Sequence, residues 1–226
     1  MPRLARIVVP GMPHHVTQRG NNRQDVFFVD DDRIAYLKLL AEQCRLYRVA
    51  ILGYCLMTNH VHHILIPSTA EALAKALGRT HWRYTQYVNA AHGRSGHLWQ
   101  NRFYSAAMDD DHALLAMRYL ERNPVRARLC RIAQRYPWSS AAAHCDGRDP
   151  LQILDLPQWN TLSSGLEWEN ELAEAIDDRQ IAQIRLSTHT GRPMASDRLI
   201  AKLERALGRR LRPLQVGRPA KKRRTK

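Results

Sequence analysis

The stretch Met57-Thr58-Asn59-His60-Val61-His62-His63-Ile64-Leu65-Ile66 is predicted to lie at the centre of the fold. Apolar runs at residues 50–57 and 60–66 flank Thr58-Asn59, a pattern that predicts two strands joined as a hairpin lying centrally in a sheet. Because side chains alternate along a strand, His60 and His62 should share one face, about 6.6 Å apart along the chain. This spacing suits two ligands of one metal ion, although isolated pairs of this kind are often ordinary histidines of a core or turn.

The segments on either side of this hairpin predict an α+β domain. Hydrophobic periodicity, turn residues and acidic helix starts predict elements in the order strand, helix, strand, strand, helix, strand, helix, at residues 15–19, 30–44, 50–57, 60–66, 73–88, 98–107 and 109–123. This order is typical of a ferredoxin-like antiparallel sheet with packed helices. We predict that this domain covers residues 1–145.

The C-terminal part, residues 146–226, predicts a different organisation. A connecting stretch to residue 167 precedes two polar helices, at 169–186 and 196–207, whose separation by Thr190-Gly191-Arg192-Pro193 permits a helix-turn-helix. The remaining tail is basic and lacks acidic residues, which predicts salt-dependent binding to phosphates. The candidate nucleic-acid contacts of this part are Arg192, Arg209, Arg210, Arg218, Lys221 and Lys222.

Composition restricts the partners more than the fold. The 226-residue chain carries a formal net charge of +14, which favours a polyanionic partner such as nucleic acid. No apolar run approaches the roughly 20 residues that span a bilayer, and the N-terminus does not resemble a signal peptide, so we expect a cytoplasmic protein without membrane contact. The four scattered cysteines predict reduced thiols, with neither a disulfide framework nor a zinc knuckle.

A second chemical motif lies in the helix predicted before Pro124. Tyr119 and Asn123 are four residues apart and should share a helix face, about 6 Å apart along the axis. Taken singly, each has a structural explanation, because a helical tyrosine usually packs by its ring and an asparagine before proline often ends a helix. Together with the hairpin, however, the motif offers two imidazoles, an amide oxygen and a phenol.

This combination suits a catalytic cation beside a nucleophile. His60, His62 and Asn123 would give three ligands and leave positions open for water and substrate. The amide oxygen favours Mg²⁺ or Mn²⁺, whereas the imidazoles would also accept zinc. Tyr119 would attack a phosphodiester polarised by the ion. Because only neutral imidazole binds metal, we expect activity to fall near or below the unperturbed histidine pKa of about 6.5.

Arginines and aromatic residues alternate in two further segments, 81–84 and 99–103. Rings that stack on bases and guanidinium groups that meet phosphates are typical of single-stranded nucleic-acid binding, although core aromatic residues on a basic surface give a similar pattern. Arg83 and Arg102 are the candidate phosphate contacts of these segments.

Three phrases in this order, at residues 56–62, 98–103 and 119–127, resemble the single-tyrosine HUH transposases, and most closely the REP-associated tyrosine transposases. The phrases His15-Val16-Thr17-Gln18-Arg19-Gly20-Asn21 and Tyr136-Pro137-Trp138-Ser139-Ser140 support this resemblance, which covers about the first 145 residues. Arg19 and Asn21 of the first phrase are candidate DNA contacts.

The resemblance implies a ferredoxin-like bacterial enzyme that cuts and rejoins single-stranded DNA beside hairpins, acting as a monomer or homodimer. His60, His62 and Asn123 would be the metal ligands, with Asn123 in place of the glutamine of many insertion-sequence relatives. Tyr119 would form a 5′-phosphotyrosine link, and His63 would point to the opposite face. Two alternatives stay open: a non-catalytic hairpin-binding or repressor protein, and a metal phosphodiesterase that uses water.

Overall fold

The computed structural model describes residues 6–212, and within them the chain divides into two compact units, up to Ala195 and from Ser196 onward. The first unit contains a four-stranded antiparallel sheet built from β1 (His14–Arg19), β2 (Val49–Met57), β3 (His60–Pro67) and β4 (Tyr104–Ala107). Their order in the sheet is β2-β3-β1-β4. This arrangement confirms the predicted α+β fold with a ferredoxin-like antiparallel sheet.

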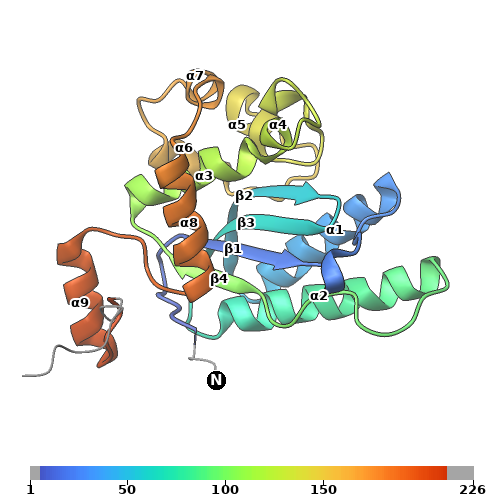
Figure 1. The fold of residues 1–226 in the computed structure, drawn as a ribbon, viewed down its shortest axis with the longest axis horizontal. Coiled ribbons are helices and arrows are strands. Elements are labelled where there is room, and N and C mark those ends of the chain that lie inside the picture. Colours follow the sequence, from blue (N-terminus) through green and yellow to red (C-terminus); the bar gives the residue numbers. More distant parts are fainter. Residues whose placement is uncertain (1–5, 213–226) are drawn as a thin grey trace, which may run out of the picture. The chain divides into compact units, whose positions relative to one another are not determined.

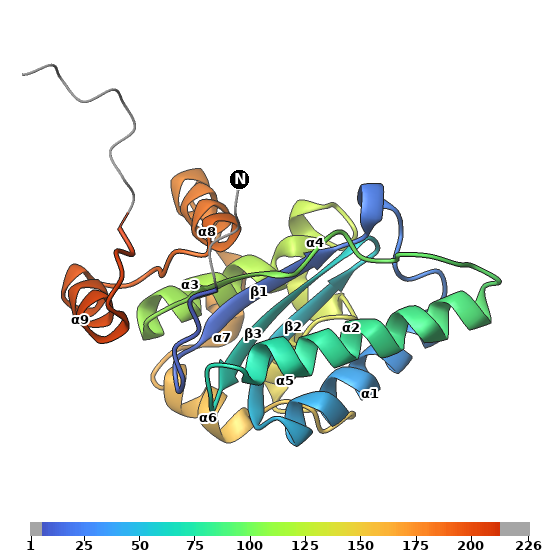
Figure 2. The ribbon, with the colours of Figure 1, turned by 90° about the horizontal axis from the view of Figure 1, so that it is seen from below.

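Two helices cover one face of this sheet (Figure 2). They are α1 (Asp30–Leu46), which begins with three aspartates, and α2 (Ala72–Ala91). Apolar side chains of both helices, including Leu37, Leu40, Leu73 and Leu77, form one hydrophobic core with Val16, Val61 and Leu65 of the sheet. Because these strand residues alternate with His15, Thr17 and His62, the opposite face is left for the polar residues.

The opposite face carries α3 (Asp110–Glu121) and α8 (Asp178–Thr190) (Figures 1 and 2). Asp109 caps α3 by accepting a hydrogen bond from the backbone of His112. Gly53 lets α3 approach β2 closely, since a Cβ there would lie 2.3 Å from the sulfur of Met117. Met117, Leu120 and Ile184 belong to the second hydrophobic core, which fixes both helices over the strands.

The remaining helices of the first unit are short. They are α4 (Asn123–Arg126), α5 (Ala141–Asp146), α6 (Leu156–Leu162) and α7 (Trp168–Ala173), together with the 3-10 turns Asn21–Arg23 and Ala133–Arg135. Buried Glu121 ties several of them to α3, because its carboxylate accepts from Trp168 Nε1 at 2.8 Å, bonds Ser140 and lies 2.7 Å from His144 Nδ1. These contacts fix the end of α3, where Tyr119 lies.

Two predicted strand features are wrong. The hairpin is not wholly central, because β2 is the edge strand of the sheet. Later chain segments bond its outer side, through Leu56 N–H to the Trp138 carbonyl at 2.8 Å and Asp155 N–H to the Ile51 carbonyl at 2.9 Å. The strand predicted at 98–107 includes only 104–107, since Asn101 has a left-handed φ of 56° that interrupts extended pairing.

The predicted helices also need correction. Helix α3 ends at Glu121, and Asn123 begins α4 instead of ending the preceding helix, with Pro124 in the first turn, where its missing N–H costs little. The helix predicted at 169–186 is interrupted after Ala173, because Glu174 is extended (ψ 141°) and Asp177 caps a new helix. The connecting stretch predicted at 146–167 contains α6.

The first compact unit continues beyond residue 145, because α8 packs on β4 and β1. The second unit contains α9 (Asp197–Leu207), so the two predicted polar helices belong to different units. Arg218, Lys221 and Lys222 lie outside the described residues. Within the described part of the chain, no helix combines the length and apolar character needed to span a bilayer.

Candidate active site

The hairpin places His60 and His62 as the sequence predicts, on the face away from α1 and α2. In the sheet, His60 pairs with Arg19 of β1, and His62 pairs with Thr17. The two imidazole centroids are 5.1 Å apart with an interplanar angle of 78°. His63 points to the other face, where its Nε2 bonds the Tyr36 hydroxyl at 2.9 Å. Because side chains alternate along β3, His63 lies on the opposite face of the sheet from His60 and His62.

Tyr119 lies directly against this pair. Its ring centroid is 5.7 Å from that of His62 and 5.9 Å from that of His15, and both contacts are edge to face. The side chain is only 4% exposed, and its hydroxyl accepts a hydrogen bond from Arg185 Nε at 3.2 Å. Helix α3 and the hairpin thus bring together a phenol and two imidazoles that are 59 (Tyr119 and His60) and 57 (Tyr119 and His62) residues apart in the sequence.

Asn123, at the start of α4, lies beside Arg126. Its Oδ1 accepts a hydrogen bond from the Arg126 guanidinium, which also donates to the Tyr119 carbonyl at 2.8 Å and lies 4.2 Å from the centroid of the Tyr119 ring. Among the described residues, the buried Nδ2 of Asn123 has no hydrogen-bond partner. Arg126 therefore holds the Asn123 oxygen and the Tyr119 backbone in a fixed relation.

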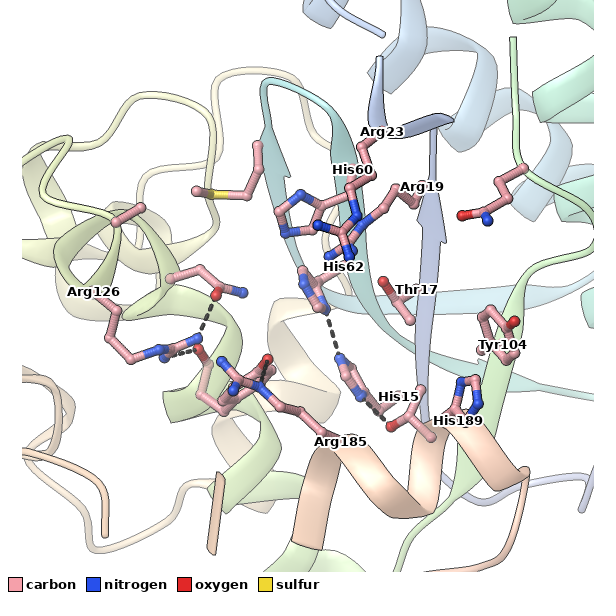
Figure 3. Close-up of a pocket in the computed structure, with 16 residues that line it drawn as sticks. His15, Thr17, Arg19, Arg23, His60, His62, Tyr104, Arg126, Arg185 and His189 are labelled. Atoms are coloured by element: carbon pink, nitrogen blue, oxygen red, sulfur yellow. Dashed lines mark hydrogen bonds between the residues drawn. The ribbon is translucent and has the colours of Figure 1, made fainter. Parts of the chain in front are cut away.

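These residues line a cavity of about 620 Å³ (Figure 3). The lining combines the predicted His60, His62, Tyr119, Asn123 and Arg19 with residues that the sequence analysis did not select: His15, Thr17, Arg23, Met57, Gln100, Tyr104, Arg126, Ala127, Arg185, Thr188 and His189. It includes four arginines, and no acidic side chain is among its described residues. Such a lining suits a phosphodiester.

Burial keeps His15, His60 and His62 neutral. Desolvation lowers the pKa of His60 to about 4, and the charges of Arg19 and Arg126 act in the same direction. Desolvation also lowers the pKa of His62 well below its ordinary value and that of His15 to about 3. At neutral pH both histidines of the hairpin can therefore offer lone pairs to a cation.

The hydrogen bonds of His60 and His62 leave Nε2 free in both rings. His60 Nδ1 donates to Asn59 Oδ1 at 2.6 Å, which makes His60 Nε2 the lone-pair nitrogen. His62 Nδ1 is bonded to His15 Nε2 at 2.9 Å, so its Nε2 is also the nitrogen without an intramolecular hydrogen bond in the described structure. The Asn123 oxygen has a second lone pair besides the one directed at Arg126. The three side chains therefore fit a divalent cation.

No alternative metal cluster is present in the described residues: three or more histidine, cysteine, aspartate or glutamate side chains nowhere gather around one point. A cation in the cavity would thus need the amide of Asn123 or oxygens of a substrate to complete its ligands. This requirement favours a hard cation such as Mg²⁺ or Mn²⁺ over zinc, whose structural sites are rich in sulfur and nitrogen ligands.

The other predicted nucleic-acid contacts lie elsewhere. Arg102 lines a second cavity, of about 590 Å³, with His81, Trp82 and Trp99. Arg83 pairs with Glu42 of α1, which is why it does not reach either cavity. Asn21 lies in a 3-10 turn that bonds the Leu98 carbonyl. Arg192 follows α8, while Arg209 and Arg210 belong to the second unit.

Some of the missed residues had a sequence signal. His15 and Thr17 alternate with Arg19 on β1 and therefore share its face. Arg126 follows Tyr119 by seven residues, a spacing that returns to the same side of a helical segment. Arg185 and Thr188 had no such signal, because their place depends on how α8 docks on the sheet.

Comparisons with known proteins identify the family of the chain. A sequence model of the family described as "Transposase IS200 like" matches residues 8–123, slightly more than half of the chain. The solved structure of a REP-associated tyrosine transposase bound to a REP hairpin is similar, with a TM-score of 0.55 and 18% identity over 67% of this chain and 90% of that one. At this identity the similarity supports the fold alone.

A second solved structure, of a candidate transposase from Deinococcus radiodurans, has a TM-score of 0.37 and 18% identity, and covers 57% of this chain and 92% of that one. No curated protein matches the chain. The family match includes the hairpin with both histidines, every lining residue of the second cavity except Arg6, and the helix of Tyr119, and it ends at Asn123. The chain belongs to the family of IS200-like transposases.

Proposed function

We propose that this protein cleaves and rejoins single-stranded DNA next to hairpins, with Tyr119 as the nucleophile. The observation that carries this proposal is the position of the Tyr119 ring, 5.7 Å from that of His62 within a cavity lined by four arginines. Arg185 also donates to the Tyr119 hydroxyl, which places a positive charge beside the oxygen that would become negative during attack. DNA transposition, the activity of the family, requires that strands be both cut and joined.

In the proposed reaction the Tyr119 oxygen attacks a DNA phosphorus. The phenol loses its hydroxyl proton as the 5′-phosphotyrosine ester forms, the P–O3′ bond breaks, and the released O3′ takes up one proton to become a 3′-hydroxyl, so that protons balance. Because the product is again a phosphodiester, a second 3′-hydroxyl can attack it and release Tyr119 without ATP. Arg185 donates to the attacking oxygen and stabilises the negative charge that develops there in both directions.

His60, His62 and Asn123 are the proposed ligands of a divalent cation, Mg²⁺ or Mn²⁺. When bound, such a cation polarises the scissile phosphodiester as a Lewis acid. The protein's own contribution is to keep both imidazoles neutral, to bind their Nδ1 hydrogens to Asn59 and His15, and to hold the Asn123 amide through Arg126. The shorter side chain of asparagine would be accommodated by its place in the first turn of α4.

The proposed DNA contacts extend from the active-site cavity to the second cavity. Arg19 and Arg23 would bind the phosphates beside the scissile bond, and Arg102 with Trp82 would hold an unpaired nucleotide further along the strand. The loop 98–103 separates the two cavities, since Gln100 lines the first and Arg102 the second. Hairpin DNA is the proposed substrate, because the solved relative described above is bound to a REP hairpin.

The test is formation of a covalent protein–DNA adduct. The full chain is incubated with a labelled single-stranded oligonucleotide that contains a hairpin, with Mn²⁺, and the products are separated under denaturing conditions. The adduct should form with the wild-type protein and with Tyr47→Phe, a tyrosine outside both cavities, and should be absent with Tyr119→Phe. An adduct that survives in Tyr119→Phe but is lost in Tyr104→Phe, the other phenol of the cavity, would reassign the nucleophile.

An alternative function is non-catalytic binding or repression through hairpin DNA. The observation in its favour is the basic second unit, in which Arg205 of α9 lines one hollow with Arg209, Arg210 and Arg212, which follow the helix. Tight hairpin binding that is insensitive to a chelator, without an adduct under any divalent ion, would favour this alternative.

A further inference from the structure

Three buried side chains from three elements form a continuous hydrogen-bonded chain beside the cavity (Figure 3). Thr188 of α8 contacts His15 of β1, with its Oγ1 2.7 Å from His15 Nδ1, and His15 Nε2 lies 2.9 Å from His62 Nδ1 of β3. The exposed fractions of the three residues are 2%, 1% and 6%. The two imidazole planes are nearly parallel, with an interplanar angle of 2° and centroids 5.1 Å apart. This chain leads from α8 to a proposed cation ligand.

The direction of each hydrogen bond follows from the Thr188 hydroxyl. Its single proton is donated to the Ile184 carbonyl at 2.8 Å, so toward His15 the oxygen can only accept. His15 Nδ1 therefore carries the hydrogen, and in a neutral ring His15 Nε2 has the lone pair. That lone pair accepts from His62 Nδ1, which leaves His62 Nε2 as the nitrogen that can bind a cation.

We propose that Thr188 and His15 are positioning residues that fix His62 in the tautomer with a free Nε2. The inference rests on the proposed function, in which His62 is a ligand, and adds two residues that act through it. Metal-bound histidines generally donate a hydrogen bond from their other ring nitrogen to a fixed acceptor, which sets the tautomer and the ring orientation. Here the acceptor is a second histidine, itself oriented by a threonine that lies outside the family match at residues 8–123.

A purely structural role would also satisfy buried polar atoms, but it explains less. His60 reaches the same result by a separate route, because its Nδ1 donates to Asn59 Oδ1. Two neighbouring histidines with different partners thus both present Nε2. Packing of the rings alone does not decide which nitrogen carries the hydrogen, whereas a ligand of a cation must keep a lone pair on the nitrogen that binds it.

The test compares Thr188→Val, which keeps the shape but removes the hydroxyl, with Thr188→Ser, which keeps the hydroxyl. Long-range ¹H–¹⁵N NMR of the full chain without metal reports which ring nitrogen of each histidine carries the hydrogen. We expect His62 with hydrogen on Nδ1 in the wild type and in Thr188→Ser, and a mixture of tautomers in Thr188→Val. The His60 signals serve as an internal control and should be the same in all three proteins.

Mn²⁺ binding, followed by titration calorimetry without DNA, supplies the second measurement. Loss of a hydrogen-bond partner of a metal-bound histidine typically weakens metal affinity about 10- to 100-fold. We expect the Kd for Mn²⁺ to rise about 10-fold or more in Thr188→Val. In Thr188→Ser the Kd should stay within about 2-fold of the wild-type value. His15→Gln, whose amide oxygen can accept from His62, should bind Mn²⁺ more tightly than His15→Leu.

Two outcomes would overturn the inference: an unchanged His62 tautomer in Thr188→Val, or a changed tautomer with wild-type Mn²⁺ affinity. Thermal unfolding of each variant shows whether it is folded, and the Thr188 pair decides the question even if the His15 variants do not fold. Failure of the proposed function looks different, because the wild-type protein itself would then form no adduct with DNA. The tautomer measurement does not depend on cleavage, so the two failures are distinguishable.

Discussion

Arg185 Nε donates to the phenolic oxygen of Tyr119 at 3.2 Å, although the two residues are 66 positions apart in the chain. The guanidinium carbon of Arg185 also lies 5.9 Å from the centroid of the tyrosine ring. A permanently charged donor is thereby fixed on the atom that is proposed to attack phosphorus and later to leave it.

We therefore expect Arg185→Ala to slow adduct formation by about 100-fold, the effect typical of removing one donor to a developing oxyanion. The rate is measured in single turnover with saturating hairpin DNA, so that weaker DNA binding does not contribute. Arg179→Ala, which removes an exposed arginine of the same helix, is the matched control and should keep the wild-type rate. Equal rates for the two variants would exclude a role of Arg185 at the phenol.

Acid should destabilise the fold because several histidines are buried in the neutral form. Desolvation lowers the pKa of His14 and His60 to about 4 and that of His15, His63 and His81 to about 3. In the unfolded chain these groups take up protons near pH 6.5, whereas in the native state they do not, so stability is lost as the pH falls from about 6.5 toward 4.

Each such histidine contributes a slope of up to about 1.4 kcal/mol per pH unit within this window. Urea denaturation between pH 7 and pH 5 measures the change, and the slope should disappear above about pH 7.5. A free energy of unfolding that stays constant from pH 7 to 5 would contradict the burial of neutral imidazoles. The lowered pKa of His60 also moves the expected protonation of this ligand from the region of pH 6.5 to about 4.

Gly53 should be sensitive to a single added methyl group. A Cβ at this position would lie 2.3 Å from Met117 Sδ and 2.7 Å from Met117 Cε, and Met117 is fully buried in α3. Gly53→Ala is expected to lower the free energy of unfolding by about 1–3 kcal/mol through overpacking. It should also slow adduct formation, because α3 carries Tyr119.

Gly78→Ala provides the comparison, since a Cβ there meets no atom within 4 Å and the residue lies inside α2. Replacing glycine by alanine in a helix interior typically stabilises it by up to about 1 kcal/mol. Both variants can be compared by urea denaturation. Equal stabilities would mean that α3 moves away from β2 without cost.

Local patterns were sufficient to predict the parts of the site that depend on one element. Alternation placed His60 and His62 on one face and His63 on the other. Tyr119 and Asn123 line the same cavity, but they belong to two successive helices and not to one helix face as their spacing predicted. Alternation failed at residues 98–103, where Asn101 adopts a left-handed conformation that the apolar pattern does not reveal. The pattern also could not place β2 at an edge, because the segments that cover its outer side are more than 80 residues away.

The contribution of α8 could not be predicted for a different reason. The sequence of α8 is polar and does not indicate which strand the helix packs on. Arg185 and Thr188 therefore could not be assigned to the site from the sequence, because their position depends on the packing of α8 against β4 and β1. The same limit applies to Arg83, which appeared equivalent to Arg102 but is engaged by Glu42. Which arginine faces a cavity depends on packing between helices.

The docking of α8 has a practical consequence for work with shortened proteins. A fragment trimmed to the region shared with the family would retain the hairpin histidines and Tyr119, but it would lack the side of the active-site cavity that α8 forms. Its failure to cut DNA would then say nothing about the chemistry of the intact chain. Fragments for biochemistry or crystallisation should therefore extend at least through residue 195.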